Sequence, residues 1–314
     1  MNERTNFFCL CMSPAIDGTV QLKTAPANGA IMKDVEETET VGGKGLNVAR
    51  WLALRGERVA CGGLLGADNA VPFEREMARH GIRDAFLRVP GSTRKNEMIV
   101  WPGGSVKLNR KAFPGLTASD WSLDALLAPF TDAGSVCILS GSLPPTVPAD
   151  FYAQAIRALK ARGIRTVLDT SGAPLVTALR EAGAECRPDL IKPNADECEP
   201  LVGFVPKTPD EFRRATEMLR VFCGFPIISD GAAGCWFNGT FVAAPQVAAL
   251  DTTAAGDTLL AEFCHRYFSR NRDDCAPDLP NAARWAVAAG SASVTCPGAQ
   301  PPPFDLVETL ASSL

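Results

Sequence analysis

The stretch best suited to chemistry is residues 251–258, Asp-Thr-Thr-Ala-Ala-Gly-Asp-Thr. The eight residues before it are typical of a strand and the ten after it of a helix. Its small residues therefore lie at a helix start, where backbone N–H groups lack intrahelical partners and the macrodipole is positive. Ala254, Ala255 and Gly256 can present bare amides to a phosphate, and Asp257 can act as a base beside it. A plain helix N-terminus with a dipole-favoured Asp explains the segment equally well.

A glycine-rich segment, residues 41–50, opens a second predicted helix. Its glycines would let a ligand approach the backbone closely. The spacing is not that of a Walker A loop, and the segment lacks the G-x-G-x-x-G of a dinucleotide fold. Alone it is a weak functional signal. The candidate binding residues here are Gly42, Gly43, Lys44 and Asn47.

Residues 192–197, Lys-Pro-Asn-Ala-Asp-Glu, follow a predicted strand and begin a helix. Asn194 stands at the cap position and Glu197 in the first turn, a spacing that a capping box explains adequately. The alternative is a hydrated Mg²⁺ held through amide and carboxylate oxygens beside nucleotide phosphates. The small-residue loop from Gly231 to Gly234, after Ser229, either borders a nucleotide or simply turns.

Two further candidates surround a possible substrate. Asp17 follows the apolar strand 7–12, and ligands gather at the carboxyl ends of such strands, although an Asp-Gly pair is also typical of a turn. Arg94 and Lys95 form the clearest basic cluster, with Asn96 beside them. They are either solvated loop charges or the fork that an acidic protein needs for a phosphorylated ligand.

The whole chain has the composition of an ordinary soluble globular protein: 314 residues, 46% hydrophobic and 21% charged, with a formal charge of −4. That charge argues against a nucleic-acid or anionic-membrane surface. The 11 cysteines are scattered and the sequence shows no signal peptide or membrane span, so we expect buried or free thiols in a reducing cytosol. With only two histidines, a Ser/His/Asp triad is improbable.

Strand and helix patterns alternate along the chain, which predicts a parallel sheet with helices on both faces. Residues 19–40 and a hairpin over 98–108 are more polar and predict a lid outside that sheet. The main strands are expected at 7–12, 59–63, 136–139, 166–169, 190–191 and 227–231, with more within 234–244. The helix opened by the glycine-rich segment is expected to run to about Arg55. Further helices are expected at 71–80, 118–129, 149–162, 173–182, 196–202, 209–222, 282–295 and 306–314.

With these motifs in order, the chain resembles the ribokinase-like (PfkB) carbohydrate kinases over nearly its whole length. The matching motifs are Gly42-Gly43-Lys44-Gly45-x-Asn47-Val48-Ala49, Asn194-x-x-Glu197 and Asp251-Thr252-x-Ala254-Ala255-Gly256-Asp257. The resemblance implies an α/β fold: a three-layer, mainly parallel sheet with helices on both faces and a small β-sheet lid. It also implies one kinase domain over 1–314, with lid segments at about 13–40 and 91–112.

The same resemblance implies ATP and Mg²⁺ as cofactors, with a monovalent cation possible, and a homodimer formed through the lid in the cytoplasm. Several segments, among them 140–145 and 168–172, are similar to the phosphosugar branch of the family. The expected reaction is phosphorylation of a ketohexose phosphate, with fructose 1-phosphate first and tagatose 6-phosphate or fructose 6-phosphate as alternatives. A free-sugar or nucleoside kinase, or a non-catalytic sugar-phosphate sensor, is a further alternative.

Residue roles carried over from the family are as follows. Catalysis is implied for Asp257, as the base, and for the amides of Ala254, Ala255 and Gly256. Sugar-phosphate binding is implied for Asp17, Gly42, Gly43, Lys44, Asn47, Arg94, Asn96, Lys33 and Ser142. Nucleotide binding is implied for Lys192, Asn194, Glu197, Ser229, Gly231, Gly234 and Thr252, with Mg²⁺ held by Asn194 and Glu197 through water. The chain departs from the family pattern at Ala254, Ser13, Lys33 and Asp230.

Overall fold

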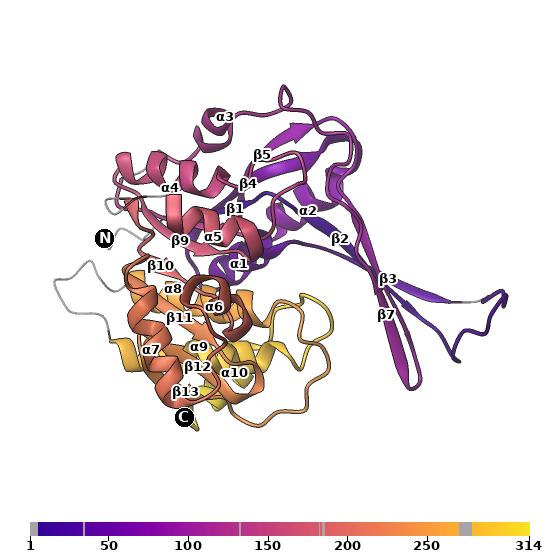
Figure 1. Ribbon diagram of the computed structural model, residues 1–314. Coiled ribbons are helices and arrows are strands. Elements are labelled where there is room, and N and C mark those ends of the chain that lie inside the picture. The colour runs from indigo at the N-terminus through magenta and orange to yellow at the C-terminus, as the bar shows by residue number, and fades with distance from the viewer. Residues whose placement is uncertain (1–5, 34, 132, 182, 184–185, 270–277) are drawn as a thin grey trace.

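The computed structural model describes residues 6–33, 35–131, 133–181, 183, 186–269 and 278–314. Within these residues one large sheet of nine strands forms the body and a separate sheet of four strands projects from it (Figure 1). This is the α/β fold with a lid that the sequence predicts. None of the helices in these ranges is long and apolar enough to cross a membrane.

The large sheet is mainly parallel. Its strand order is β13-β12-β11-β10-β9-β8-β1-β4-β5, and only the β11–β12 and β12–β13 pairs are antiparallel. The strands are β1 (Asn6–Cys11), β4 (Arg58–Gly66), β5 (Arg83–Val89), β8 (Val136–Ser140), β9 (Arg165–Asp169), β10 (Leu190–Ile191), β11 (Phe225–Ser229), β12 (Gly234–Phe237) and β13 (Thr240–Ala243).

Helices cover both faces of this sheet because its central strands are apolar on both sides. Phe7 and Cys9 of β1 face one hydrophobic core, while Phe8 and Leu10 face another. The first core is closed by α1 (Lys44–Leu54), α2 (Val71–Arg79), α8 (Ala255–Ser269), α9 (Leu279–Ser293) and α10 (Phe304–Ser312). The second is closed by α3 (Leu123–Leu127), α4 (Phe151–Ala161), α5 (Gly172–Glu181), α6 (Ala195–Val202) and α7 (Pro209–Leu219).

The lid is a four-stranded sheet of order β3-β2-β6-β7, built from β2 (Ala15–Gln21), β3 (Glu36–Gly42), β6 (Lys95–Trp101) and β7 (Gly104–Leu108). β2 runs antiparallel to β3 but parallel to β6, so the two lid segments, far apart in sequence, pair directly. In Figure 1 this sheet extends as a long arm from the body.

The sheet order places a topological switch point between β1 and β8. The chain first builds β4 and β5 on one side of β1 and later adds β8 to β11 on the other. Open α/β sheets bind ligands at the carboxyl ends of strands near such a point. The residues after β1, β8, β9 and β10 therefore meet at one edge of the sheet.

Two predicted elements differ from the structure. Only Leu123–Leu127 of the helix predicted over 118–129 is helical, because Asp120 holds Thr117 in a turn and Ser122 supplies a later cap. The strand predicted just before residue 251 is absent, since β13 ends at Ala243 and Pro245 cannot donate to a ladder.

One strand was not predicted, and one predicted helix ends at a residue outside the described ranges. Strand β5 was missed because its charged residues mask the apolar alternation, as is common on a sheet edge. The helix predicted over 173–182 is α5, and Ala182 lies outside the described residues. The ten described cysteines are all unpaired, as the sequence predicts.

Candidate active site

Asp257 lies in the first turn of α8 and is only 4% exposed. Asn47 of α1 donates a hydrogen bond from Nδ2 to Oδ2 of Asp257 at 2.9 Å, and Nζ of Lys44 lies 3.5 Å from Oδ1. The glycine-rich helix start and the C-terminal helix start therefore meet at one carboxylate. Gly43 makes this approach possible, because its φ is 114° and a Cβ there would lie 2.8 Å from Cys11 Sγ.

A second buried carboxylate, Asp169 at the end of β9, lies beside the first. Its Oδ2 accepts a hydrogen bond from Lys44 Nζ at 3.0 Å, and its Oδ1 is 3.3 Å from Lys192 Nζ. Asp169 and Lys192 are 2% and 5% exposed, so their ion pair is well shielded from solvent. Two carboxylates and two ammonium groups thus form one cluster at the sheet edge.

The surroundings of the two carboxylates shift their pKa values in opposite directions. Burial raises the pKa of Asp257, and the charge of Asp169 adds to this rise while Lys44 opposes it. Burial also favours protonation of Asp169, yet Lys192 and Lys44 together hold its pKa below the usual value. Asp169 is therefore a fixed anion, while Asp257 is the more basic carboxylate. A pair tuned apart in this way is typical of acid–base chemistry.

The anion hole suggested by the sequence lies at the start of α8. Ala254 has a left-handed φ of 62°, a conformation that glycine adopts more readily. A Cβ on Gly256 would lie 3.2 Å from Lys192 Nζ, so an ammonium group sits directly at this helix start. Ala255, Gly256 and Lys192 together make the positive surface that a phosphate requires.

A cavity of about 390 Å³ adjoins this helix start. The chain that replaces the predicted strand, residues 244–249, forms one wall, and α9 contributes Gly290 and Ser291. Five of the residues assigned to the nucleotide from sequence line it, together with Gly256. They are Asn194, Ser229, Gly231, Gly234 and Thr252.

Asn194 and Glu197 form a complete capping box. Asn194 Oδ1 accepts from the N–H of Glu197 at 2.8 Å, and Glu197 Oε2 accepts from the N–H of Asn194 at 2.9 Å. Among the residues that the structure describes, no group of three His, Cys, Asp or Glu side chains is arranged to hold a metal. A protein cage for a metal is therefore absent there. The side-chain oxygens of Asn194 and Glu197 fit Mg²⁺ only as a hydrated ion, bound through its waters beside phosphates.

The candidate sugar-binding residues lie where the lid meets the body. Asn96 of β6 donates from Nδ2 to Asp17 Oδ1 at 2.9 Å. A Cβ on Gly42 would lie 3.0 Å from Asp17 Oδ2 and 3.5 Å from Asn47 Oδ1, so these groups surround the same point. Asn47 Oδ1 is buried without a hydrogen-bond partner among the described residues. It is free to accept from a bound hydroxyl.

Arg94 reaches the same region from the start of β6. Its Nη2 donates to the carbonyl of Ser13 at 3.3 Å and its Nη1 to the carbonyl of Arg110 at 3.2 Å. Both acceptors are backbone carbonyls, so neither of these contacts places an opposite charge against the guanidinium. Lys33, in the connection between β2 and β3, and Ser142, after β8, are both exposed.

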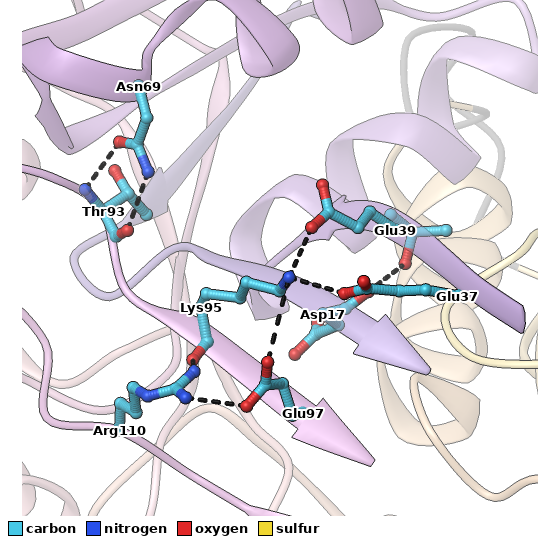
Figure 2. Close-up of polar contacts among 9 residues, drawn as sticks. Asp17, Glu37, Glu39, Asn69, Thr93, Lys95, Glu97 and Arg110 are labelled. Carbon is cyan, nitrogen blue, oxygen red and sulfur yellow. Dashed lines mark hydrogen bonds and ion pairs between the residues drawn. The ribbon is translucent and has the colours of Figure 1, made fainter. Parts of the chain in front are cut away.

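Two residues of this region were missed from sequence. Asp169 ends a predicted strand and belongs to the 168–172 resemblance segment but was given no site role, although a charged residue closing the apolar run Val167-Leu168 was a usable signal. Arg110 lies beside Arg94 but follows the hairpin in an irregular segment without a recognisable pattern. Lys95, paired with Arg94 in the sequence argument, instead contacts Glu37 and Glu39 on the other face of the lid (Figure 2).

The chain shares sequence with known proteins over most of its length. A model described as pfkB family carbohydrate kinase matches residues 13–305. A 1-phosphofructokinase of Rhodobacter capsulatus is 32% identical over 312 residues, covering 96% of this chain and 95% of the relative. One from Xanthomonas campestris is 35% identical over 289 residues, covering 88% and 87%. A tagatose-6-phosphate kinase of Staphylococcus epidermidis is 28% identical, covering 84% and 86%.

Solved structures agree in fold. Phosphofructokinase-2 from Escherichia coli in complex with potassium superposes with a TM-score of 0.85 at 23% identity and covers 99% of both chains. Ribokinase from Giardia lamblia gives a TM-score of 0.73 at 19% identity, covering 97% of this chain and 99% of that one. The chain thus shares its fold with these solved structures.

Proposed function

The chain belongs to the pfkB family of carbohydrate kinases, and we propose that it phosphorylates a ketohexose phosphate, converting fructose 1-phosphate and ATP into fructose 1,6-bisphosphate and ADP. The observation that carries this proposal is the position of Asp257. It is a buried carboxylate of raised pKa at a helix start, between the nucleotide cavity and the lid. The relatives named as 1-phosphofructokinases support the choice of substrate.

Asp257 acts as the base in this reaction. Its carboxylate accepts the proton of the acceptor hydroxyl as that oxygen bonds to the γ-phosphorus, while the bond from phosphorus to the β,γ-bridging oxygen breaks and ADP leaves. Asn47 orients the carboxylate through its 2.9 Å hydrogen bond. Lys44 and Lys192 offset the negative charge that gathers on the transferring group, which is the main requirement of phosphoryl transfer.

The cavity beside α8 suits the nucleotide. Small residues at Gly231, Gly234 and Gly256 leave the backbone accessible, and the start of α8, whose helix dipole favours an anion, lines the cavity with Ala255 and Gly256. Mg²⁺ shields phosphate charge when bound. Asn194, which lines both this cavity and the adjoining groove, would hold its waters together with Glu197, its partner in the capping box.

The sugar phosphate lies between lid and body in this proposal. Asp17, Asn96 and Asn47 meet its hydroxyl groups, and Arg94 meets the phosphate already present on the sugar. A planar guanidinium can contact two phosphate oxygens at once. Tagatose 6-phosphate or fructose 6-phosphate would use the same residues, so they are the alternative substrates. One relative is a tagatose-6-phosphate kinase.

A coupled ADP-release assay over phosphorylated and free ketohexoses tests the proposal. We expect the highest kcat/KM with fructose 1-phosphate, and little turnover of any free sugar. The assay is run with and without K⁺, because one solved relative is a potassium complex. Preference for a free sugar or nucleoside contradicts the phosphosugar assignment, and no turnover of any substrate favours a sensor.

We also propose that two copies associate through the lid. Strand β7 exposes Val106 and Leu108, each more than 40% accessible, and the connection between β2 and β3 exposes Ile31 at 83%. Apolar side chains at such exposure favour a covering surface. Light scattering should give twice the monomer mass, and charged substitutions at Val106 and Leu108 should halve it.

A further inference from the structure

Thr93, the residue just before Arg94, is hydrogen-bonded to the body of the protein through all its polar groups. Thr93 is 2% exposed, and all three of its polar groups are hydrogen-bonded, one to the last residue of β4 and two to Asn69 in the segment that follows. Its N–H donates to Asn69 Oδ1 at 2.7 Å, and its carbonyl accepts from Asn69 Nδ2 at 2.9 Å. Its hydroxyl accepts from the N–H of Gly66 at 2.9 Å. Figure 2 shows the two hydrogen bonds between Asn69 and Thr93, at a distance from the ion pairs of Lys95 in the lid.

The backbone around Gly66 is shaped for this contact. A Cβ on Gly66 would lie 2.3 Å from the nitrogen of Thr93, so any other residue would push the two segments apart. Asn69 ends the short 3₁₀ helix η1 (Ala67–Asn69), and its side-chain amide pairs with Thr93 as a strand neighbour would. We call this pair of bonds the Asn69–Thr93 clasp. It fixes the point at which the lid strand β6 leaves the body.

The residues after the clasp alternate between the two faces of the lid. Arg94 and Asn96 share the face of Asp17, where Asn96 contacts the Asp17 carboxylate. Lys95 points to the opposite face, where Glu37 and Glu39 each lie 2.6 Å from its Nζ (Figure 2). A slip of one residue at the start of β6 would exchange the two basic side chains between faces. The direction of Arg94 therefore depends on the position of Thr93.

We propose that Asn69 is a positioning residue for the substrate: it clasps Thr93 so that Arg94, rather than Lys95, faces the phosphate already carried by the sugar. This inference rests on the proposed function, because it takes Arg94 as the phosphate contact. Asn69 itself touches no substrate. It acts by keeping Arg94 on the rigid body while the rest of the lid extends outward.

A double-substitution cycle over Asn69→Ala and Arg94→Ala tests this. Asn69→Ala should raise KM for the sugar phosphate roughly tenfold, with kcat within about twofold and KM for ATP unchanged, since two hydrogen bonds that orient one ligand contact are lost. In the Arg94→Ala background the same change should raise that KM less than about twofold, because nothing remains to be positioned. Asn69→Asp, which keeps the acceptor for the Thr93 N–H, should fall between.

The matched control is Asp68→Ala, which alters the same turn without touching Thr93 and should leave both KM values unchanged. Equal effects of Asn69→Ala in both backgrounds, or a lower Tm with an unchanged sugar-phosphate KM, would overturn the inference. If Arg94→Ala itself leaves the sugar-phosphate KM unchanged, the proposed phosphate contact fails. A defect in Arg94→Ala without one in Asn69→Ala removes only the positioning role.

Discussion

Nδ2 of Asn47 donates a 2.9 Å hydrogen bond to Oδ2 of Asp257, joining residues 210 positions apart. The bond connects the first turns of α1 and α8, so the two glycine-containing helix starts form one site. It leaves Asn47 Oδ1 buried without a partner in the described part of the chain. The amide is thus oriented by the Asp257 carboxylate on one side and open to a hydroxyl on the other.

Asp257→Asn should lower kcat by at least ~10²-fold while the enzyme stays folded and binds ATP, because a positioned base contributes on that scale. Steady-state kinetics and nucleotide titration of the same preparation measure both effects. Asp251→Asn changes a carboxylate that serves the backbone of Thr253 and Gly298, and should cost less in kcat. An unchanged kcat in Asp257→Asn removes this residue from the chemistry.

The same substitution should also stabilise the protein increasingly as pH rises. Burial raises the pKa of Asp257, so its contribution to stability is complete below the pKa of the unfolded chain and is lost as pH rises through the folded pKa. Asparagine carries no charge and avoids that loss. Tm measured from pH 4 to pH 8 should show a gain for Asp257→Asn that grows with pH, and a gain at acid pH only contradicts the sign.

Lys44→Met should move the acid limb of the kcat/KM profile to higher pH. Burial and the charge of Asp169 raise the pKa of Asp257, and Lys44 opposes this rise. Removing Lys44 should therefore raise that pKa further. A pH–rate profile measures the shift. Lys160→Met, which breaks an ion pair with Asp189 on another face, is the control and should leave the profile in place.

Arg94→Ala should raise KM for the sugar phosphate by roughly one to two orders of magnitude, as expected for a lost charge-assisted contact of about 1.5–3 kcal/mol, with KM for ATP nearly unchanged. Lys95→Ala, from the opposite lid face, is the matched control and should leave the sugar-phosphate KM within about twofold. A rise in the ATP KM alone means that Arg94 faces the nucleotide.

Glu197→Gln separates the two roles of its motif. Glutamine can still accept from the N–H of Asn194, so the capping box and Tm should be kept, while the carboxylate charge that we propose to act on Mg²⁺ is lost. Activity should fall at low Mg²⁺ and recover partly when Mg²⁺ is raised. Normal kinetics with a lowered Tm instead indicate a capping role alone.

Ala254→Gly should raise the free energy of unfolding by about 0.5–1 kcal/mol, because the left-handed φ of 62° strains alanine more than glycine, and the greater flexibility of unfolded glycine offsets part of the gain. Chemical denaturation measures it. Gly256→Ala is the reverse change nearby and should lower activity, since its Cβ would lie 3.2 Å from Lys192 Nζ. Destabilisation by Ala254→Gly contradicts the strain argument.

Local sequence patterns predict elements here better than they predict partners. The continuous apolar run of β1 identified a strand buried on both faces, and the spacing from Asn194 to Glu197 identified a capping box that is present. The pairing of Lys44 with Asp169 depends on β9 lying beside β8 in the sheet, which no local pattern encodes. The side taken by Lys95 depends on strand register, which the Arg-Lys pair alone does not reveal.

The strand order has a consequence for synthesis of the protein. Phe7 of β1 pairs with Val136 of β8, so a nascent chain holds β1 with one edge unpaired until about that length has left the ribosome. The centre itself is complete only when Asp257 has emerged. Chains released early are inactive and carry an open, apolar strand edge, which makes them substrates for chaperones or aggregation rather than partly working enzymes.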